Sequence, residues 1–346
     1  MADYTQYGGP SPEWLAIADS LPTVPADVSR EQRRQLLNEQ REKGAAEAMK
    51  VLGPQVTTRD YSVPTRDGSS IEARTYRPVG VDGSKVLPVY YHLHGGGWFF
   101  GTLSSEDATC ARIAINAQVV HYGVYEARLT WDDVEDAFEW LHDHIVDIGG
   151  DAKQVVMGGI SAGGQLTASF VLGKHLGQVS SDKRPSPVGQ VLMIPNLVNM
   201  SCYRPLKSRL KNPSVSSYEQ NKDAAIMPMA VARFFMNQLN VPNPKPEDLK
   251  INQVYATADQ VKGLPPTVFG VAGWDILRDE GLLWAEDLAN AGVPTDVHLF
   301  PGLPHGFRRA GDKLAASEHW DKVMEQGITW VLSNPAATGK FEINIE

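Results

Sequence analysis

Residues 155–173 read VVMGGISAGGQLTASFVLG, an apolar strand pattern that passes through a glycine-rich turn into a helical pattern. The turn holds a single serine, Ser161, within Gly159-Ile160-Ser161-Ala162-Gly163. A serine on such a turn lies at the carboxyl end of a sheet, with its hydroxyl exposed above the following helix. Glycines flank it because side chains there would collide with the neighbouring strand and helix. The stretch predicts a strand–turn–helix unit with Ser161 as candidate nucleophile, and the alternative is a turn that only packs helix against strand.

Apolar runs alternate with helical patterns on both sides of this stretch. Strands are predicted at 86–93, 117–124, 153–160, 188–195 and 265–273, and helices at 130–149 and 279–292. Strands that are apolar along their whole length are buried on both faces, which is typical of a doubly wound, mostly parallel α/β sheet. Residues 56–77 alternate instead, and Arg66-Asp67-Gly68 supplies a turn, so an antiparallel hairpin opens the sheet. Before it, Ser29 and Gln32 predict a capping box at the start of a long helix.

Composition limits the kind of partner. The 346 residues are 42% hydrophobic and 21% charged, with a net charge of −9, which disfavours nucleic acid and anionic membranes as partners. No window reaches about 18 apolar residues and the first residues carry no leader pattern, so we expect a cytoplasmic protein without a membrane span. Cys110 and Cys202 are expected to be reduced thiols, and no His, Cys or carboxylate cluster has metal-ligand spacing. We expect a small ligand and neither metal nor cofactor; a homodimer stays open.

A second glycine-rich stretch follows the strand at 86–93. Residues 93–100 read LHGGGWFF, and three consecutive glycines let backbone N–H groups approach a ligand closely. A serine that attacks a carbonyl builds negative charge on the carbonyl oxygen, and backbone N–H groups stabilise that charge. We therefore predict an oxyanion hole formed by Gly96, Gly97 and Ala162. The alternative is a flexible loop or a phosphate-binding nest, although no P-loop lysine follows.

A serine nucleophile needs a base and an orienting carboxylate. Among nine histidines, His305 in FPGLPHGF stands on a loop late in the chain, where the order serine, acid, histidine requires it. We expect His142, His144, His175 and His319 on exposed helix faces, His92, His121 and His298 within strands, and His94 as a brace for the glycine loop. For the acid we favour Asp275, directly after a strand, over Asp279, which is interpreted as a solvated charge at a helix start.

HGGGW, GISAGG, GWDILRDEG and PGLPHGF occur in this order, and the chain thereby resembles the hormone-sensitive-lipase-like group of α/β-hydrolases. The resemblance implies an α/β-hydrolase fold with a helical cap, a Ser161, Asp275 and His305 triad, and hydrolysis of carboxylic esters without a cofactor. Two segments depart from the family pattern. HYGVYEARLTWDD at 121–133 stands where the family carries Y-R-L-A-P-E, and Ile160 replaces an acidic residue frequent before the serine.

The periodic pattern stops between residues 199 and 256. We predict a core of 56–198 and 257–335, a cap insertion at 199–256, and an N-terminal helical segment, 1–55, that contributes to the cap. Trp98 and Phe99 after the glycines, and Phe234 and Phe235 in the insertion, are candidate substrate contacts for small to medium apolar acyl groups. The alternative is that the Met and Phe residues of the insertion, Met227, Met229, Phe234, Phe235 and Met236, form the cap's own core. The same triad would also serve an acyltransferase, a lactonase or a thioesterase, and a receptor on this scaffold is a further alternative.

Overall fold

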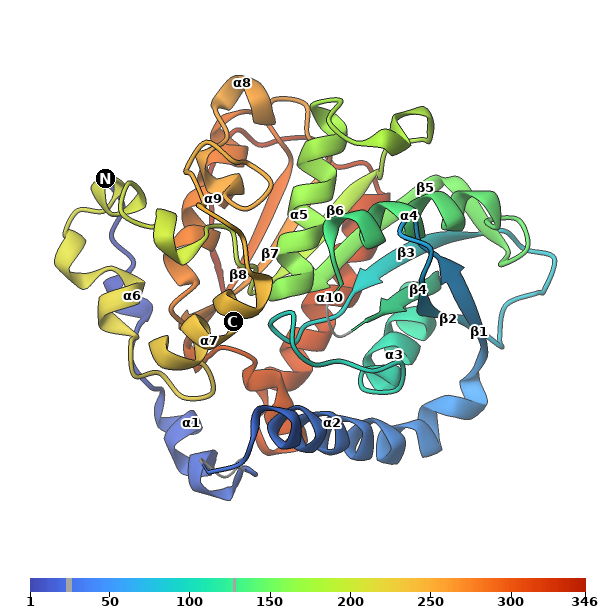
Figure 1. Cartoon of the computed structure of the whole chain (residues 1–346), viewed down its shortest axis with the longest axis horizontal. Helices are drawn as coiled ribbons and strands as arrows, with labels where there is room; N and C mark the ends of the chain where they lie inside the picture. Colours follow the sequence, from blue (N-terminus) through green and yellow to red (C-terminus); the bar gives the residue numbers. More distant parts are fainter. Residues whose placement is uncertain (23–26, 127–128) are drawn as a thin grey trace.

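The computed structural model describes residues 1–22, 27–126 and 129–346, and its centre is a mostly parallel sheet (Figure 1). Described strands follow the spatial order β1-β2-β4-β3-β5-β6-β7-β8-β9. The predicted apolar strands are all present, and those in the middle of the sheet are buried on both faces, which confirms an α/β fold. Their bounds are β1 Val56–Pro64, β2 Ser70–Pro78, β3 Leu87–Leu93, β4 Val120–Tyr125, β5 Gly150–Ile160, β6 Gly189–Met193, β7 Thr267–Trp274, β8 Thr295–Pro304 and β9 Asn344–Ile345.

The antiparallel part of the sheet lies at one edge. Strands β1 and β2 form the predicted hairpin, with Gly68 at φ 87° in its turn, and β2 also pairs antiparallel with β4. From β4 onward neighbouring strands pair in parallel. The carboxyl ends of β3, β5, β7 and β8 consequently meet at one side of the sheet, where functional loops gather in α/β folds.

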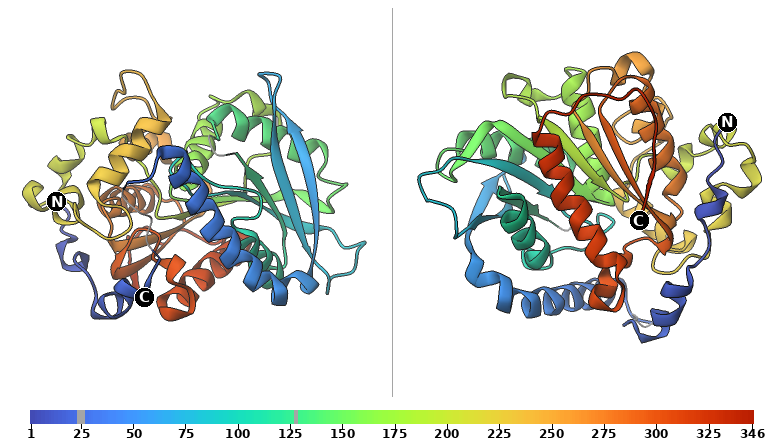
Figure 2. Two further views of the ribbon diagram at one scale, coloured as in Figure 1. Left: turned by 60° about the horizontal axis from the view of Figure 1, so that its bottom comes forward. Right: turned by 180° about the vertical axis from the view of Figure 1, so that it is seen from behind.

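Helices cover both faces of the sheet. On one face pack α4 (Trp131–Asp143), α5 (Ala162–His175) and α9 (Arg278–Asn290), and on the other α3 (Asp107–Ala117) and α10 (Ala316–Leu332). The view from behind shows α10 crossing the sheet (Figure 2). Among the described residues, no helix combines the length and apolarity needed to cross a membrane.

Two segments lie outside these layers. The N-terminal one contains α1 (Pro12–Ile17) and the 23-residue α2 (Arg30–Leu52), which begins with the predicted capping box at Ser29 and Gln32. In Figure 1, α2 runs along the lower edge of the molecule. The segment at 199–256 contains short 3-10 turns, α6 (Ser217–Gln220) and α7 (Met229–Leu239), and α8 (Ala258–Val261) follows it.

Two of the histidines expected on exposed helix faces are buried to some degree. His142 is 8% exposed and packs edge-on against Phe138, and its burial lowers its pKa to about 4. His144 is half-buried and stacks on Trp140, because α4 ends at Asp143 and the chain turns back there. Of the unusual segment at 121–133, residues 127–128 lie outside the described residues, while Thr130 caps α4 in the ordinary way.

Candidate active site

Ser161 lies at the sharp turn between β5 and α5. Its backbone has φ 56° and ψ −112°, a conformation rarely adopted by residues other than glycine. The Ser161 N–H donates to the Met193 carbonyl at 2.8 Å, which ties the turn to the end of β6. A Cβ atom on Gly163 would lie 2.0 Å from the Leu93 carbonyl oxygen, and one on Gly159 would lie 2.4 Å from Gly163. Glycine is therefore required on both sides of the turn that raises the Ser161 side chain.

His305 and Asp275 form a continuous hydrogen-bonded line with this serine. The Nε2 atom of His305 lies 2.9 Å from Ser161 Oγ, and its Nδ1 atom lies 2.7 Å from Asp275 Oδ2. Asp275 directly follows β7 and His305 directly follows β8, so two neighbouring parallel strands deliver both side chains. Asp275 is 1% exposed, and its other carboxylate oxygen accepts the Leu277 N–H at 3.0 Å. A proton on Nδ1 faces the carboxylate, which leaves Nε2 free to accept the serine proton.

Asp279 takes no part in this line, and its interpretation as a solvated charge is wrong. It is 1% exposed, and one carboxylate oxygen accepts from Arg278 Nε at 2.9 Å while the other accepts the Ser217 N–H at 2.6 Å. The cause is the segment at 199–256, which packs over the first turn of α9 and buries the aspartate beside a buried guanidinium. Asp279 therefore joins that segment to α9.

The glycine loop leaves β3 beside the serine turn. A Cβ atom on Gly95 would lie 3.1 Å from the Ile160 carbonyl oxygen, and one on Gly96 would lie 1.9 Å from the Phe100 carbonyl oxygen. Gly96 and Gly97 have φ values of 148° and 60°, which favour glycine. Within the described ranges, the Gly96, Gly97 and Ala162 N–H groups donate to no protein acceptor. Three backbone donors are thus left for a ligand beside Ser161.

His94 braces this loop, as expected. Its Nδ1 atom lies 2.9 Å from the Gly95 carbonyl oxygen, and its Nε2 atom lies 3.1 Å from the Glu126 carbonyl oxygen. The ring stacks on Tyr125 with centroids 5.7 Å apart, and burial lowers the pKa of His94. A buried neutral imidazole in this position stabilises the loop.

The candidate substrate contacts lie at the meeting of the glycine loop and α7. Trp98 and Phe99 are 8% and 3% exposed, and Phe234 and Phe235 are half-buried. The Phe99 and Phe234 rings meet edge to face with centroids 5.0 Å apart. Phe99, Phe234 and Phe235 form an apolar layer between the loop and α7, and Trp98 belongs to the main hydrophobic core.

Part of the stripe of Met and Phe residues serves packing. Met227 is 5% exposed within the main hydrophobic core, and Phe235 and Met236 pack against that core. A Cβ atom on Gly97 would lie 2.4 Å from the Phe235 ring, so this ring rests directly on the glycine loop. Phe235 is therefore both a packing residue of α7 and a neighbour of the candidate oxyanion donors.

The fold also gathers a buried His and Cys group that sequence spacing did not reveal. His92, Cys110 and His121 come from β3, α3 and β4, with ligand atoms within 4.8 Å of one another. Ligands of a tetrahedral zinc ion lie roughly 3.5 Å apart, so this spacing is looser than a zinc site requires. His92 Nε2 lies 2.8 Å from Glu106 and Cys110 Sγ lies 3.0 Å from the Tyr125 hydroxyl, whereas His92 Nδ1 and both ring nitrogens of His121 have no hydrogen-bond partner among the described residues. Cys110 and Cys202 are both free and buried.

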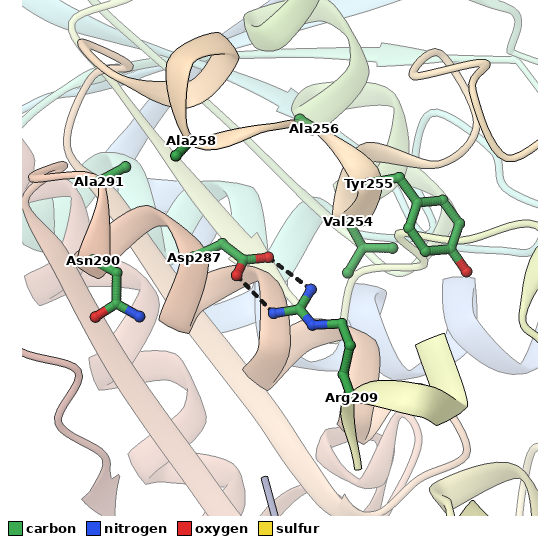
Figure 3. A pocket seen from close by; sticks show the side chains of 8 residues that line it. All are labelled: Arg209, Val254, Tyr255, Ala256, Ala258, Asp287, Asn290 and Ala291. Carbon is green, nitrogen blue, oxygen red and sulfur yellow. Dashed lines mark hydrogen bonds and ion pairs between the residues drawn. The ribbon is translucent and has the colours of Figure 1, made fainter. Parts of the chain in front are cut away.

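A cavity of about 360 Å³ lies beside α9, away from this site (Figure 3). Arg209 and Asp287 face each other in its wall, and the two guanidinium nitrogens lie 2.8 and 2.6 Å from the carboxylate oxygens. Each charge is therefore satisfied by the other. Ser161, Asp275 and His305 are not among the residues that line this cavity.

Sequence reasoning missed two buried side chains that hold the site together. Asn221 donates from Nδ2 to the carbonyl oxygens of Asp275 at 2.8 Å and Gly273 at 3.1 Å. Glu280 accepts the Leu197 N–H at 2.7 Å, and burial raises the pKa of its carboxyl group well above the ordinary range. Glu280 lies within the recognised GWDILRDEG motif, so a signal for it existed. Asn221 lies in the aperiodic segment, where the sequence offers none.

The chain is similar to known proteins over most of its length. A family described as alpha/beta hydrolase fold matches residues 90–309. The chain is 31% identical over 278 residues to Esterase LipI of Mycobacterium tuberculosis, covering 77% of this chain and 79% of LipI. Among solved structures, a bacterial heroin esterase superposes with a TM-score of 0.75 at 25% identity, covering 94% of this chain and 98% of that one. The vibralactone cyclase structure superposes with a TM-score of 0.81 at 24% identity, covering 96% and 97%, and shows the shared fold.

Proposed function

The chain belongs to the α/β-hydrolase fold family and is an ester-cleaving hydrolase, and from this premise we propose that Ser161, His305 and Asp275 are its catalytic triad. The observation that carries the proposal is the hydrogen-bonded line from Ser161 Oγ through His305 to Asp275, with distances of 2.9 and 2.7 Å. Nucleophile, base and orienting acid stand in the order that acyl transfer requires.

In the proposed reaction, Ser161 Oγ attacks the ester carbonyl carbon while its proton passes to His305 Nε2. The tetrahedral intermediate collapses to an acyl-enzyme, and the same proton goes to the departing alcohol. Water then attacks the acyl-enzyme, giving its proton to His305, and the acid product leaves as the proton returns to Ser161. Asp275 holds the Nδ1 proton in place and stabilises the imidazolium that forms twice in each cycle.

The Gly96, Gly97 and Ala162 N–H groups form the oxyanion hole in this proposal. Their support is threefold: the loop and the serine turn are in contact, both glycines have positive φ values, and the three donors lack protein acceptors among the described residues. Donors fixed before the substrate arrives need no reorganisation as the charge develops, which is why they contribute strongly to the rate.

We also propose that the substrates are esters of small to medium apolar acids. Phe234 meets Phe99 and Phe235 lies against Gly97, so apolar side chains adjoin the proposed oxyanion hole, while a sugar or a peptide would need polar partners. Trp98 is included among the proposed contacts because it directly follows Gly97 in the sequence. The segment at 199–256 acts as a cap with help from residues 1–55, and α7 is its inner helix. The enzyme works in the cytoplasm, and water is the acyl acceptor.

A chemical label tests the proposal directly. A p-nitrophenyl ester should give a burst of p-nitrophenol equal to one acyl group per chain, and an organophosphate should abolish the burst. Peptide mapping should find the phosphorus on Ser161. A label on another serine would contradict the assignment, and turnover that persists in the fully labelled enzyme would contradict the mechanism.

A further inference from the structure

Several side chains of α2 contact the glycine loop, and one of them, Arg41, reaches the peptide bond between Gly95 and Gly96. Arg41 donates from Nη1 to the Gly95 carbonyl oxygen at 3.0 Å, its Nη2 atom pairs with the Glu106 carboxylate, and its guanidinium lies 5.3 Å from the centre of the Phe100 ring. We propose that Arg41 is a positioning residue that aims the Gly96 N–H through the peptide bond joining Gly95 to Gly96. The inference rests on the oxyanion role proposed above for Gly96.

The Gly95 carbonyl and the Gly96 N–H belong to the same peptide unit. This unit is planar and trans, so its C=O and N–H bonds point in opposite directions within one plane. A hydrogen bond that fixes the direction of the Gly95 oxygen therefore also fixes the direction of the Gly96 N–H. His94 Nδ1 lies 2.9 Å from the same oxygen, so the neutral ring adds a second hydrogen bond to it when the proton is on Nδ1.

The peptide bond between Gly95 and Gly96 depends more than most on hydrogen bonds from other residues to fix its orientation. Neither residue carries a Cβ atom, so the peptide plane turns with little steric penalty. A donor that must be turned into position during the reaction gives up part of its stabilising effect, because preorganisation is what makes such donors effective. Arg41 and His94 supply the rigidity that the two glycines lack.

The charge of Arg41 acts on the same peptide. A cationic donor on the amide oxygen draws electron density toward that oxygen, and hydrogen bonds in such a chain strengthen one another. The Gly96 N–H becomes a stronger donor toward an oxyanion as a result. This effect is lost when the arginine is replaced by a neutral side chain of similar length.

Glu106 keeps the guanidinium in place. It is 5% exposed, and although burial alone would raise its pKa, Arg41 and His92 together hold the pKa of this carboxyl group well below its ordinary range. Glu106 is therefore ionised at neutral pH and holds one end of the guanidinium, while the other end holds the Gly95 oxygen.

Other contacts between α2 and the loop provide matched controls. Glu42 Oε1 accepts a hydrogen bond from the Thr102 hydroxyl at 2.5 Å, a contact of α2 that does not involve the Gly95–Gly96 peptide. Replacing Glu42 by alanine weakens the docking of α2 without removing a hydrogen bond of that peptide. Arg34 pairs with Glu31 on the surface of the same helix, so its replacement removes a charge from α2 and nothing from the loop.

The test compares R41M, R41K, E42A and R34A in the full chain. For each variant we would measure kcat and KM on p-nitrophenyl butyrate, inhibition by a trifluoromethyl ketone that forms a tetrahedral adduct with the serine, and the urea midpoint. R41M should lower kcat about 10- to 100-fold while KM stays within about twofold of the parent value. Inhibition by the ketone should weaken by a factor similar to the loss of kcat. The kcat of R41K should fall between those of R41M and the parent. E42A should lower the urea midpoint while keeping kcat, and R34A should keep both.

Each outcome bears on the proposal. It is overturned if R41M and R41K keep the parent kcat, or if E42A lowers kcat as much as R41M does at an equal loss of midpoint, which would show that α2 acts only by docking. Should R41M fail to fold, R41K decides: a reduced kcat at unchanged KM supports the proposal and an unchanged kcat overturns it. Activity that survives Ser161→Ala would instead refute the proposed catalytic role of Ser161, whatever Arg41 does.

Discussion

The ring of Phe235 lies on Gly97 so closely that a Cβ atom there would fall 2.4 Å from the ring, and Gly97 has φ 60°. The helix α7 and the glycine loop are therefore fitted to each other at a position where the loop has no side chain. This apolar contact links the position of the Gly97 N–H, a proposed oxyanion donor, to the packing of α7, which lies more than a hundred residues later in the sequence.

Gly97→Ala should consequently reduce ester hydrolysis sharply. The methyl group must displace either the Phe235 ring or the loop, and a misplaced oxyanion donor costs roughly 100- to 1000-fold in kcat. The matched control is Gly44→Ala in α2, where nothing lies within 4 Å of the added Cβ atom. It should keep kcat and stabilise the chain by up to about 1 kcal/mol. Equal kcat values for the two variants would refute the steric argument.

Ser161→Ala should leave a folded protein whose ester hydrolysis falls by about four to six orders of magnitude. Alanine keeps the Cβ atom that the φ of 56° already accommodates, so the strained turn is unchanged. Circular dichroism and the urea midpoint check the fold, and p-nitrophenyl acetate hydrolysis checks the activity. A variant with parent-like turnover would remove Ser161 from the mechanism.

Asp275→Asn should mainly lose activity, whereas Asp279→Asn should mainly lose stability. Asparagine at 275 no longer holds the Nδ1 proton of His305, so kcat should drop about 10⁴-fold while the urea midpoint changes little. Asparagine at 279 leaves the buried Arg278 without its carboxylate partner, and breaking a buried pair costs about 3 to 5 kcal/mol of folding free energy. Kinetics at a temperature where both variants are folded separates the two effects. The reverse pattern would assign the catalytic acid to Asp279.

Features that depend on residues close together in the sequence could be predicted, whereas contacts between residues far apart in the sequence could not. The strand pattern, the glycine turn at Ser161 and the capping box at Ser29 are local, and the structure contains all three. The motif order was enough to nominate Ser161, Asp275 and His305 together, because each directly follows a strand and parallel strands end at the same side of a sheet.

The failures come from contacts made across long stretches of chain. Asp279 reads as a helix-start charge until Ser217, 62 residues earlier, folds over it. The contact of Arg41 with Gly95 likewise spans 54 residues, and no pattern in the polar α2 distinguishes this arginine from its neighbours. When a distant part of the chain buries a segment, the sequence of that segment shows no periodic pattern that would indicate the burial.

Truncating Phe234 or Phe235 to alanine should separate a substrate wall from a packing core. A wall residue changes the preference among acyl chains by about 1 to 3 kcal/mol, whereas a core phenylalanine costs about 3 to 5 kcal/mol of folding free energy. Because Phe235 rests on Gly97 and Phe234 reaches Phe99, we expect the larger loss of urea midpoint for Phe235→Ala. The larger shift in kcat/KM across p-nitrophenyl esters from acetate to decanoate should follow Phe234→Ala. An unchanged chain-length profile in both variants would contradict the proposed apolar substrate surface.

His298 should make part of the stability depend on pH. Burial alone lowers its pKa, but hydrogen bonds to Asp296 and Glu346 outweigh burial, and the pKa is raised above the ordinary value. A raised pKa in the folded state gives a contribution that is fully present below the unfolded value, about 6.5, and is lost as the pH rises through the folded value. The difference in urea midpoint between parent and His298→Gln should therefore be larger at pH 6 than at pH 9. Exposed His175→Gln serves as control, and a difference that grows with pH would contradict the assignment.

The pairing of β9 with β8 also affects whether molecules associate with one another in solution. Without β9, strand β8 would form the edge of the sheet and present unpaired backbone groups to neighbouring molecules. Strand β9 pairs with it at His298 and Leu299, and the Glu346 N–H donates to the Leu299 carbonyl oxygen at 2.9 Å. Exposed strand edges invite pairing between molecules and the growth of aggregates. Residues 344–346 thus occupy a position that a second copy of the sheet could otherwise take, so a chain shortened before Asn344 is expected to precipitate more readily than the full one.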